Sequence, residues 1–287
     1  MAHQDMTLSM QICDCHKWML IFPTILIAYG IVKLLHNMSD IKGRLHFIFS
    51  FLLKTMSLLV LSFFIFLVVV AVSPSLLQRL FVFNMTNVVT YNAHMDSTRC
   101  GALSGVSGRV LELGPGPGSN FRCWGGNETK ITEWVGVEPV SLFADVQSEE
   151  KRKYGIKFST RSVWMKGENL DVDSASFDAV VGTHLLCSVD DPVVVFEQIE
   201  RALKPGGSYF FLEHTLAPHN NYFVRFAQLL VSPILRIFGN GCRQRETLKY
   251  FTSNQTVSNF DVSLEIFDAP IHMTMRPHIK GIATKKQ

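Results

Sequence analysis

The stretch Arg109-Val-Leu-Glu-Leu-Gly-Pro-Gly-Pro-Gly-Ser-Asn-Phe121 decides the fold of the C-terminal part of the chain. It predicts a short buried strand that runs through a glycine-rich turn into a helix. Gly114, Gly116 and Gly118 let the backbone turn sharply and let a ligand approach it closely. A helix that begins after such a turn offers unpaired N–H groups and the positive end of its dipole. The stretch therefore predicts a site for the polar part of a nucleotide-like ligand.

The spacing of these glycines differs from the dinucleotide-binding pattern. That pattern, G-x-G-x-x-G/A, requires Gly or Ala at position 119, where this chain has Ser119. Glu112 lies two residues before the first glycine, and its carboxylate suits a cationic amine better than a pyrophosphate. The alternative interpretation is a tight strand-to-helix turn without a ligand, and the motifs further along the chain favour the ligand.

Composition limits the possible partners. The chain has 287 residues, enough for one sizeable domain and some additional elements. Its net charge is +3 without a long basic run, so we expect no nucleic-acid partner. It has no C-x-x-C pair and no H-E-x-x-H string, so we expect no metal site. The six scattered cysteines are more typical of a reducing compartment than of a disulfide framework.

Two apolar stretches precede the glycine-rich turn. The first, near 18–35, has an uncharged run of 15 residues, which is shorter than the roughly 20 needed to span a bilayer, and we interpret it as an interfacial or re-entrant helix. The second, near 47–72, contains 18 consecutive uncharged residues and has no polar face. It predicts a membrane anchor rather than a buried core helix. We expect residues 1–75 to be the anchoring region and residues 76–287 to be the catalytic domain.

From Val110 onward, predicted strands and helices alternate, which favours an α/β fold with a parallel sheet covered by helices on both faces. The last strand is predicted as either parallel or antiparallel. Helices are expected near 140–153 and 192–203, and strands near 110–113, 133–138, 157–163, 177–183, 207–213, 262–268 and 278–284.

Polar residues at the carboxyl ends of these strands extend the predicted site. Glu138 ends the second strand 20 residues after Gly118, a position from which a carboxylate accepts hydrogen bonds from ribose hydroxyls. Gly167-Glu168-Asn169 follows the third strand, where a loop would flank an adenine ring. Thr183 and His184 end the fourth strand and are expected to point towards the ligand. An ordinary loop histidine is an equally good interpretation of His184.

The segment 215–260 is unusually apolar and aromatic. A core helix, a lid over an apolar substrate and a membrane-contacting face all fit its composition.

Several strings together resemble the membrane-anchored branch of the class I S-adenosylmethionine-dependent methyltransferases, the methyltransferase-like seven family of thiol S-methyltransferases, over about residues 76–287. The glycine turn and the Pro–Gly–Gly turn occur in many methyltransferases, whereas Leu-Cys-Ser-Val and Arg-Pro-His-Ile-x-Gly are more specific. The strings are Tyr91-Asn92-x-x-Met95, Glu112-Leu-Gly-x-Gly-x-Gly-x-Asn-Phe121, Gly167-Glu168-Asn169, Leu186-Cys187-Ser188-Val189, Leu203-x-Pro-Gly-Gly207, Glu213-His214, Gly241-Cys242 and Arg276-Pro277-His278-Ile279-x-Gly281.

The resemblance implies a Rossmann-like fold with a mostly parallel seven-stranded sheet, preceded by membrane-associated helices. It implies S-adenosylmethionine as cofactor and methyl transfer to a small apolar acceptor, foremost an alkyl thiol. A thiol with a pKa of about 8.5 is already a fair nucleophile as its thiolate, so a strong base is optional. The candidate bases or orienting groups are His214, His184 and Tyr91.

The resemblance also implies cofactor contacts, with Glu112 at the methionine amine and Glu138 at the ribose. The full set of expected cofactor-binding residues is Glu112, Gly114, Gly116, Gly118, Asn120, Glu138, Pro139, Gly167, Glu168, Asn169, Thr183 and His184.

The chain departs from the family pattern at several points. It has Glu138 where the family usually has aspartate, and Pro115 and Pro117 each remove an N–H donor from the turn. The segment between Met95 and Arg109 is shorter, and the N-terminus has two apolar stretches where the family has one.

Two other functions stay open, namely O- or C-methylation of a quinone or other membrane lipid, and a non-catalytic lipid-surface interaction protein that keeps the fold. We expect the endoplasmic reticulum or a lipid droplet as the location, with the domain facing the cytosol, where the cofactor is supplied. The positive charges of the 33–54 loop favour the opposite orientation. Asn84, Asn127 and Asn254 begin N-x-T strings and would accept glycans in a lumen.

Overall fold

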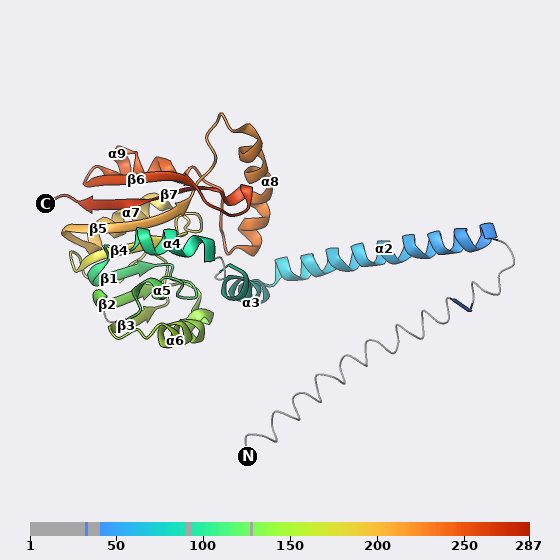
Figure 1. The fold of residues 1–287 in the computed structure, drawn as a ribbon, viewed down its shortest axis with the longest axis horizontal. Helices are drawn as coiled ribbons and strands as arrows, with labels where there is room; N and C mark the ends of the chain where they lie inside the picture. The colour runs from blue at the N-terminus through green and yellow to red at the C-terminus, as the bar shows by residue number, and fades with distance from the viewer. Residues whose placement is uncertain (1–31, 34–40, 90–92, 127–128) are drawn as a thin grey trace, which may run out of the picture. The chain divides into compact units, whose positions relative to one another are not determined.

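The computed structural model describes residues 32–33, 41–89, 93–126 and 129–287 (Figure 1). Contacts divide the chain into two compact units, Met1–Val69 and Val70–Gln287, which we describe separately. The apolar stretch expected near 18–35 lies outside the described residues, apart from two residues in a helical turn.

The expected anchor helix is longer than the sequence predicts. Helix α2 covers Ile41–Val72, so it begins six residues before position 47. Within it, Leu45–Val69 is 25 residues long with a mean hydropathy of 2.4, and it is the one described helix long and apolar enough to cross a membrane. A single residue, Ser73, separates α2 from helix α3, Pro74–Asn84. Pro74 suits the first turn of α3 because the N–H that proline lacks has no partner there.

The second unit contains a mostly parallel seven-stranded sheet, as expected for a Rossmann-like fold. The strand order is β3-β2-β1-β4-β5-β7-β6. Strands β1 to β5 run parallel, whereas β7 is antiparallel to both β5 and β6, which decides the orientation of the last strand. The bounds are β1 Ser107–Leu113, β2 Lys130–Val137, β3 Ser159–Val163, β4 Phe177–Thr183, β5 Leu203–His214, β6 Phe260–Asp268 and β7 Pro277–Lys285.

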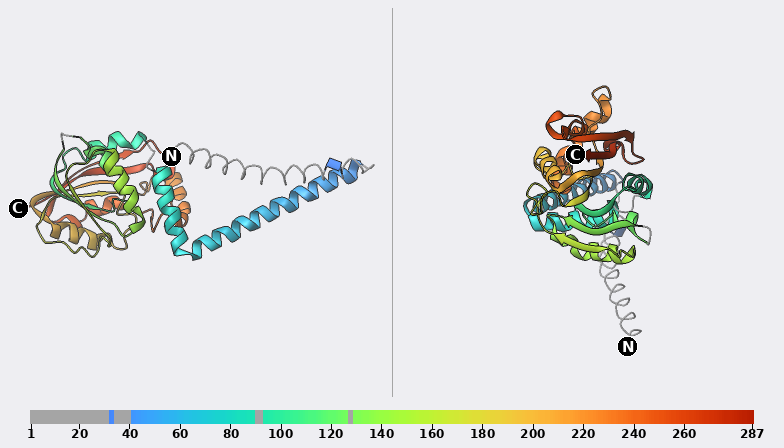
Figure 2. Two further views of the ribbon diagram at one scale, coloured as in Figure 1. Left: turned by 90° about the horizontal axis from the view of Figure 1, so that it is seen from below. Right: turned by 90° about the vertical axis from the view of Figure 1, so that its left-hand side faces the viewer.

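Alternation along the central strands assigns side chains to the two faces of the sheet. Val110 packs into a core with Phe121 and Trp134, whereas its neighbour Leu111 packs into a second core, which includes Phe196 of α7. The views in Figure 2 show the sheet between these helical layers. Glu112 shares the face of Val110, and for this reason its carboxylate meets the side chain of Trp134.

The helices around the sheet agree with most expectations. The predicted 140–153 helix is a 3₁₀ turn, Ser141–Phe143, followed by α6, Ala144–Lys153, and the predicted 192–203 helix is α7, Pro192–Ala202. Asp191 caps α7 by accepting a hydrogen bond from the N–H of Val193. The remaining helices are the π-helix Met85–Val89, α4 Ala93–Ala102, α5 Phe121–Trp124, α9 Asn254–Val257 and the 3₁₀ turns Thr247–Phe251 and Met273–Met275.

The apolar segment forms helix α8, Tyr222–Phe238, and it is not a core helix. Tyr222, Phe223, Phe226 and Leu230 are each more than 60% exposed, and Gln228 is its one buried residue. Gln228 holds α8 to the domain, because its side chain accepts a hydrogen bond from the N–H of Ala217 and donates one to the carbonyl of Thr215. The outward face of α8 is therefore apolar.

The cysteines are not all free, contrary to the expectation from their scattered positions. Cys100 at the end of α4 and Cys123 in α5 form a disulfide. Cys187 and Cys242 are free. The disulfide joins α4 to the segment that follows the glycine-rich turn.

Candidate active site

The glycine-rich turn lies at the carboxyl end of β1. Gly114, Gly116 and Gly118 all have positive φ angles, which explains why glycine occupies each position. A Cβ atom on Gly116 would meet nothing within 4 Å, so there is open space above the middle of the turn. Gln147 of α6, which the sequence analysis did not single out, supports the turn from below by donating a hydrogen bond to the carbonyl of Gly116. The helix after the turn, α5, has only four residues, so its dipole contributes little.

Glu112 is buried at the base of the turn. One carboxylate oxygen accepts a hydrogen bond of 2.7 Å from the side-chain amide of Asn120, and the other accepts one of 2.7 Å from the indole N–H of Trp134. Burial raises the pKa of Glu112 to about 7, against the opposing effect of these two hydrogen bonds. The structure thus brings Glu112 and Asn120, two of the predicted cofactor-binding residues, into contact and adds Trp134 to them.

Arg99 of α4 completes this polar cluster, and the sequence analysis missed it. Its Nη1 atom donates hydrogen bonds to the side-chain oxygens of Asn120, at 2.8 Å, and of Thr183, at 3.1 Å. Burial lowers the pKa of Arg99. In the described part of the chain no carboxylate lies within ion-pair distance of it. The one feature of the sequence that could have indicated Arg99 is its position four residues after Met95, in the helix that precedes β1 and the glycine turn.

Glu138 follows β2 and faces the glycine turn. One carboxylate oxygen accepts a hydrogen bond of 2.9 Å from the N–H of Gly116, and the other accepts one of 3.0 Å from the N–H of Val140. Burial raises the pKa of Glu138. The next residue, Pro139, is exposed beside the turn.

The loop Gly167-Glu168-Asn169 is placed near the start of α7. The side chain of Glu168 accepts a hydrogen bond of 2.7 Å from the N–H of Asp190, so it secures the segment before α7. The N–H of Asn169 closes a turn by bonding to the carbonyl of Lys166, and the residue is exposed.

Three histidines meet at the carboxyl edge of the sheet. His184 follows β4, His214 ends β5, and His278 lies at the start of β7 directly opposite His214. The Nε2 atoms of His184 and His278 are 3.0 Å apart, so one imidazole donates a hydrogen bond to the other. Burial lowers the pKa of His184 well below its usual value and that of His278 to about 4. Both rings are therefore neutral at pH 7.

His278 carried no role in the sequence analysis, although it lies in the Arg-Pro-His-Ile string. His184 has a φ of 55°, in the left-handed region that a non-glycine residue adopts at an energetic cost. The third candidate base, Tyr91, lies outside the described residues.

His214 also contacts two thiols. Its Nε2 atom is 3.6 Å from the sulfur of Cys242, and its ring centroid is 6.2 Å from that of His184. Contact with the Cys242 thiol, together with burial, raises the pKa of Cys187.

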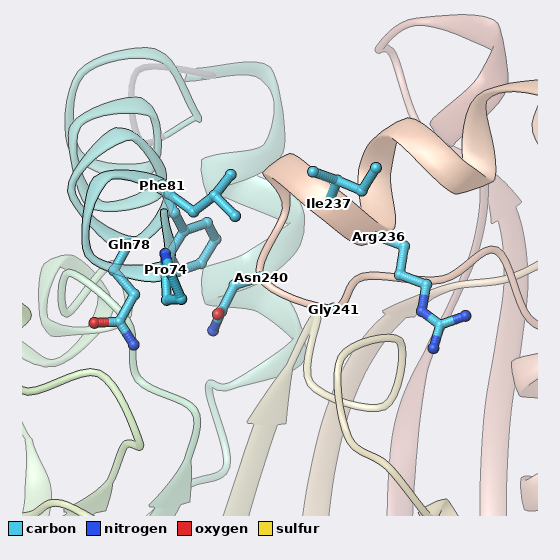
Figure 3. A pocket seen from close by; sticks show the side chains of 8 residues that line it. Pro74, Gln78, Phe81, Arg236, Ile237, Asn240 and Gly241 are labelled. Atoms are coloured by element: carbon cyan, nitrogen blue, oxygen red, sulfur yellow. The ribbon is translucent and has the colours of Figure 1, made fainter. Parts of the chain in front are cut away.

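A pocket of about 210 Å³ opens between α3 and the end of α8 (Figure 3). Phe81 of α3 and Ile237 of α8 reach it from opposite sides. Gly241, at its edge, immediately precedes Cys242. The pocket is lined by Pro74, Leu77, Gln78, Phe81, Arg236, Ile237, Asn240 and Gly241.

The site residues fit a ligand with both charged and apolar parts. The space above Gly116 admits a ligand close to the backbone. Arg99 is a half-buried cation without a carboxylate at ion-pair distance among the described residues, which suits a ligand carboxylate. Glu112 and Glu138 are buried carboxyls beside this space. A nucleoside bearing an amino-acid group matches this donor and acceptor set.

The comparisons with known proteins agree with this geometry. A family model described as "Methyltransferase domain" matches residues 111–211. The chain is 34% identical to rat thiol S-methyltransferase TMT1B over 188 residues, covering 64% of this chain and 74% of the relative. It is 31% identical to human thiol S-methyltransferase TMT1A over 212 residues, covering 69% and 82%.

Solved structures show the same fold at low identity. A Thermotoga maritima S-adenosylmethionine-dependent methyltransferase, described as a possible histamine N-methyltransferase, has a TM-score of 0.53 at 17% identity over 72% of this chain and 99% of that one. A geranyl diphosphate methyltransferase in complex with GPP and sinefungin has a TM-score of 0.51 at 16% identity over 66% and 76%.

The fold and the glycine-turn site define a class I methyltransferase that uses S-adenosylmethionine. Within this class, the chain belongs to the thiol S-methyltransferase family of TMT1A and TMT1B. The family resemblance, the enzyme class and the cofactor expected from the sequence are thus confirmed.

Proposed function

We propose that this protein methylates the sulfur of small apolar thiols while anchored to a membrane. The observation that carries the proposal is the kinship with two thiol S-methyltransferases at 31% and 34% identity. The chemistry of the site is compatible, because the imidazoles of His184 and His278 are neutral at pH 7 and a thiol acceptor needs no strong base.

We propose residues 76–287 as the catalytic domain, with the cofactor above the glycine turn. Its methionine end would lie at Glu112, Asn120 and Arg99, with the amine towards Glu112 and the carboxylate towards Arg99. In this arrangement Arg99 compensates for the N–H donors that Pro115 and Pro117 lack. Thr183 would support the same end through its hydrogen bonds to Arg99 and Asn120.

The nucleoside end of the cofactor would lie along Glu138. The carboxylate oxygen that accepts from the N–H of Gly116 would exchange it for a ribose hydroxyl, while the other oxygen keeps its bond to the N–H of Val140. The adenine ring would lie between Pro139 and the loop Gly167-Glu168-Asn169, where the backbone of Gly167 and Asn169 offers the contacts, since the side chain of Glu168 is already bonded to Asp190.

Bound S-adenosylmethionine supplies an electrophilic methyl group on a sulfonium. The protein's contribution is to align the acceptor with that group and to exclude water. His184 and His214 border the acceptor side, where either side chain would orient a thiol. His184, whose pKa is lowered by burial, is a neutral imidazole that could also accept the thiol's proton. Tyr91 remains a candidate for the same role.

A binding assay and an acceptor screen test the proposal with the full-length protein in detergent. We expect calorimetric binding of S-adenosylmethionine, and methylation of small alkyl thiols in preference to lipid phenols or quinols. Turnover of phenols or quinols without thiols would favour the lipid O- or C-methyltransferase. Absence of cofactor binding would favour a non-catalytic protein.

We further propose that two helical segments of this chain contact a bilayer. Leu45–Val69 would span it, and the exposed apolar face of α8 would lie on its surface. Connectivity supports the contact of α8, because α3 begins one residue after α2 and lies across the pocket of Figure 3 from α8. A surface helix with large exposed apolar side chains inserts them into the boundary between headgroups and acyl chains.

Tryptophan quenching by brominated lipids tests this contact in nanodiscs. Phe226→Trp on α8 should add fluorescence that the brominated lipids quench. Ile266→Trp is the matched control, because Ile266 is similarly exposed but lies on β6. Equal quenching of the two added tryptophans would contradict the proposal.

For the location we propose the endoplasmic reticulum or lipid-droplet membrane, with the domain facing the cytosol, where the cofactor is supplied. The basic residues of the 33–54 stretch and the Cys100–Cys123 disulfide favour a lumenal domain instead. Asn254 decides between them, because it is exposed and begins an N-x-T string. A glycosidase-sensitive mass shift that disappears in Asn254→Gln would place the domain in the lumen.

A further inference from the structure

Two free cysteines and a histidine meet at the carboxyl edge of the sheet, beside the site described above. Cys187 lies in the turn after β4, His214 ends β5, and Cys242 follows α8. Each offers one ligand atom, and these three atoms lie within 4.8 Å of one another. Cys187 and His214 are buried, and Cys242 is half-buried.

We propose that Cys187, His214 and Cys242 hold a zinc-class divalent ion, and that the fourth position of this ion takes the sulfur of the acceptor. The positions of the three side chains support the metal site by themselves. Only its use as the acceptor site rests on the proposed thiol S-methylation.

The geometry suits a tetrahedral ion. The distance from the sulfur of Cys242 to Nε2 of His214 is 3.6 Å. Two ligands on one tetrahedral zinc, with bonds of about 2.3 Å to sulfur and about 2.0 Å to nitrogen, lie roughly 3.5 Å apart. Two cysteines and one histidine form a known ligand set for catalytic zinc, in which the fourth position stays open. An S–H···N hydrogen bond has a similar length, so metal content must separate the two.

The backbone is built to hold these ligands together. Glu213 is fully buried and accepts hydrogen bonds from the N–H groups of Leu185 and Leu186, at 2.9 and 3.3 Å, which fixes the turn that carries Cys187. The N–H of Arg243 donates to the carbonyl of Cys187 at 2.9 Å, which ties the segment of Cys242 to the same turn.

Gly241 makes this close approach possible. Its φ is 87°, and a Cβ atom there would come within 3.3 Å of the carbonyl of Ser188. A side chain at position 241 would therefore strain the backbone and push the two segments apart. This gives a physical reason for the Gly-Cys string at 241–242.

His214 has hydrogen-bonding capacity that the described residues do not use. Its side chain is 1% exposed, and Nδ1 has no partner among them. The contact with Cys242 is made by the other ring nitrogen, Nε2, which is therefore the atom that would bind the ion. Within the protein the imidazole of His214 is held mainly by its contacts with the thiols.

Charge balance favours a divalent cation at this position. Two thiolates would be costly to bury alone. Together with a neutral imidazole and a divalent cation, they give the site a net charge of zero. A thiolate acceptor in the fourth position would give a charge of −1, next to a cofactor that carries a positive sulfonium. The two reacting groups would therefore attract each other.

The cluster adjoins the proposed cofactor site through His184. The His184 ring lies 6.2 Å from that of His214, and the preceding residue, Thr183, bonds to Asn120 of the glycine-turn cluster. On binding, the S–H bond of the acceptor would break, its proton would go to water, and a sulfur–metal bond would form. A lone pair of that sulfur would then form the new S–CH₃ bond, while the electrons of the breaking C–S bond stay on the donor's sulfur. The neutral thioether would leave the metal.

Metal analysis of the full-length protein, purified without chelators, tests the site. We expect about one zinc ion per chain in the wild-type protein. Cys187→Ser and Cys242→Ser should each lose most of it. Cys13→Ser/Cys15→Ser is the matched control that should retain it, since these two cysteines do not belong to the proposed ligand set. Replacing zinc with cobalt should produce thiolate-to-cobalt absorption bands that the first two variants lack.

Three results would overturn the metal site. These are no bound metal in the wild-type protein, metal that is lost with Cys13 and Cys15 instead, or a Cys187–Cys242 disulfide in the isolated protein. Calorimetric binding of S-adenosylmethionine by Cys242→Ser shows that the variant is folded.

The fourth position is tested separately with the cobalt form. An alkyl thiol should shift the cobalt bands, and the alcohol of the same carbon skeleton should not. Unchanged bands in a protein that methylates thiols would show that the metal is structural and would overturn its use as the acceptor site. Metal binding in a protein that methylates no thiol would refute the proposed function and leave the metal site standing.

Discussion

The carboxylate of Glu138 accepts a hydrogen bond of 2.9 Å from the N–H of Gly116, so the end of β2 closes over the glycine-rich turn. The carboxyl group proposed for the ribose is thus held in place by backbone N–H groups, those of Gly116 and Val140. Because backbone groups do this, the position of Glu138 does not depend on another flexible side chain.

Glu138→Ala should weaken the binding of S-adenosylmethionine about 10- to 100-fold, because hydrogen bonds to a charged group contribute about 1.5–3 kcal/mol. Glu138→Asp should keep most of the affinity, since the shorter carboxylate remains at the same end of β2. Calorimetry with the full-length protein measures both. Equal affinities for the wild-type protein and Glu138→Ala would refute the ribose contact.

Arg99→Gln should weaken cofactor binding by at least as much, because it removes the only cation proposed for the methionine carboxylate. Arg99→Lys should recover part of the loss, since lysine keeps the charge without the guanidinium fork. A ligand without the carboxylate, such as methylthioadenosine, supplies the control. Its affinity should be similar for the wild-type protein and Arg99→Gln, and an equal loss for both ligands would indicate a general disruption of the site.

Cofactor affinity should rise with pH because the pKa of Glu112 is raised to about 7. Above that value Glu112 is ionised and attracts the cofactor's amine, and below it the attraction is lost. The increase should therefore fall between about pH 6 and pH 8. Glu112→Gln cannot ionise, so its affinity should be low and nearly independent of pH. A wild-type affinity that is constant over this range would contradict the proposed role.

The same group should affect the stability of the ligand-free protein in the opposite direction. Its folded-state pKa lies above the unfolded value, so its contribution to stability is fully present below about pH 4.5 and is lost as the pH rises through about 7. Thermal unfolding of Glu112→Gln should lack this part of the pH dependence. An unchanged pH profile in that variant would assign the effect to other groups.

Removal of the disulfide should reduce both stability and cofactor affinity. Cys100 and Cys123 are 23 residues apart, and the chain-entropy model gives a contribution of about 3 kcal/mol for a loop of this length. Arg99 is adjacent to Cys100, so the loss of the tether should also free the guanidinium. Cys100→Ser/Cys123→Ser should melt at a lower temperature and bind the cofactor less tightly. Lower stability with full affinity would show that α4 holds Arg99 without the disulfide.

The parts of the fold and site that follow local patterns were predictable from the sequence. Short local strings predict the strands from Val110 onward and the glycine turn, because each string is compatible with one local structure. The positions of Glu112 and Glu138 follow from these elements. α2 was recognisable from its composition, although its start at Ile41 was not, because Lys42 and Arg44 interrupt the apolar run.

The rest depends on contacts between distant segments. Arg99 and Asn120 are 21 residues apart, and His184 and His278 are 94 apart, so no local pattern links them. Cys187, His214 and Cys242 likewise come from distant segments, so no C-x-x-C string marks this cluster. The sequence also left α8 ambiguous between core and surface, since only the packing of Gln228 shows which face turns inward.

If Leu45–Val69 spans a bilayer, as proposed, the single residue between α2 and α3 has a kinetic consequence. A catalytic domain tethered this closely to a lipid-embedded helix would meet hydrophobic molecules by lateral diffusion in two dimensions rather than from bulk water. Its apparent Michaelis constant would then depend on the acceptor's partition coefficient and on the volume of lipid in the assay. Acceptors of equal intrinsic reactivity would be ranked by their oil–water partitioning, and diluting the bilayer with more lipid would slow the enzyme at a constant total amount of acceptor.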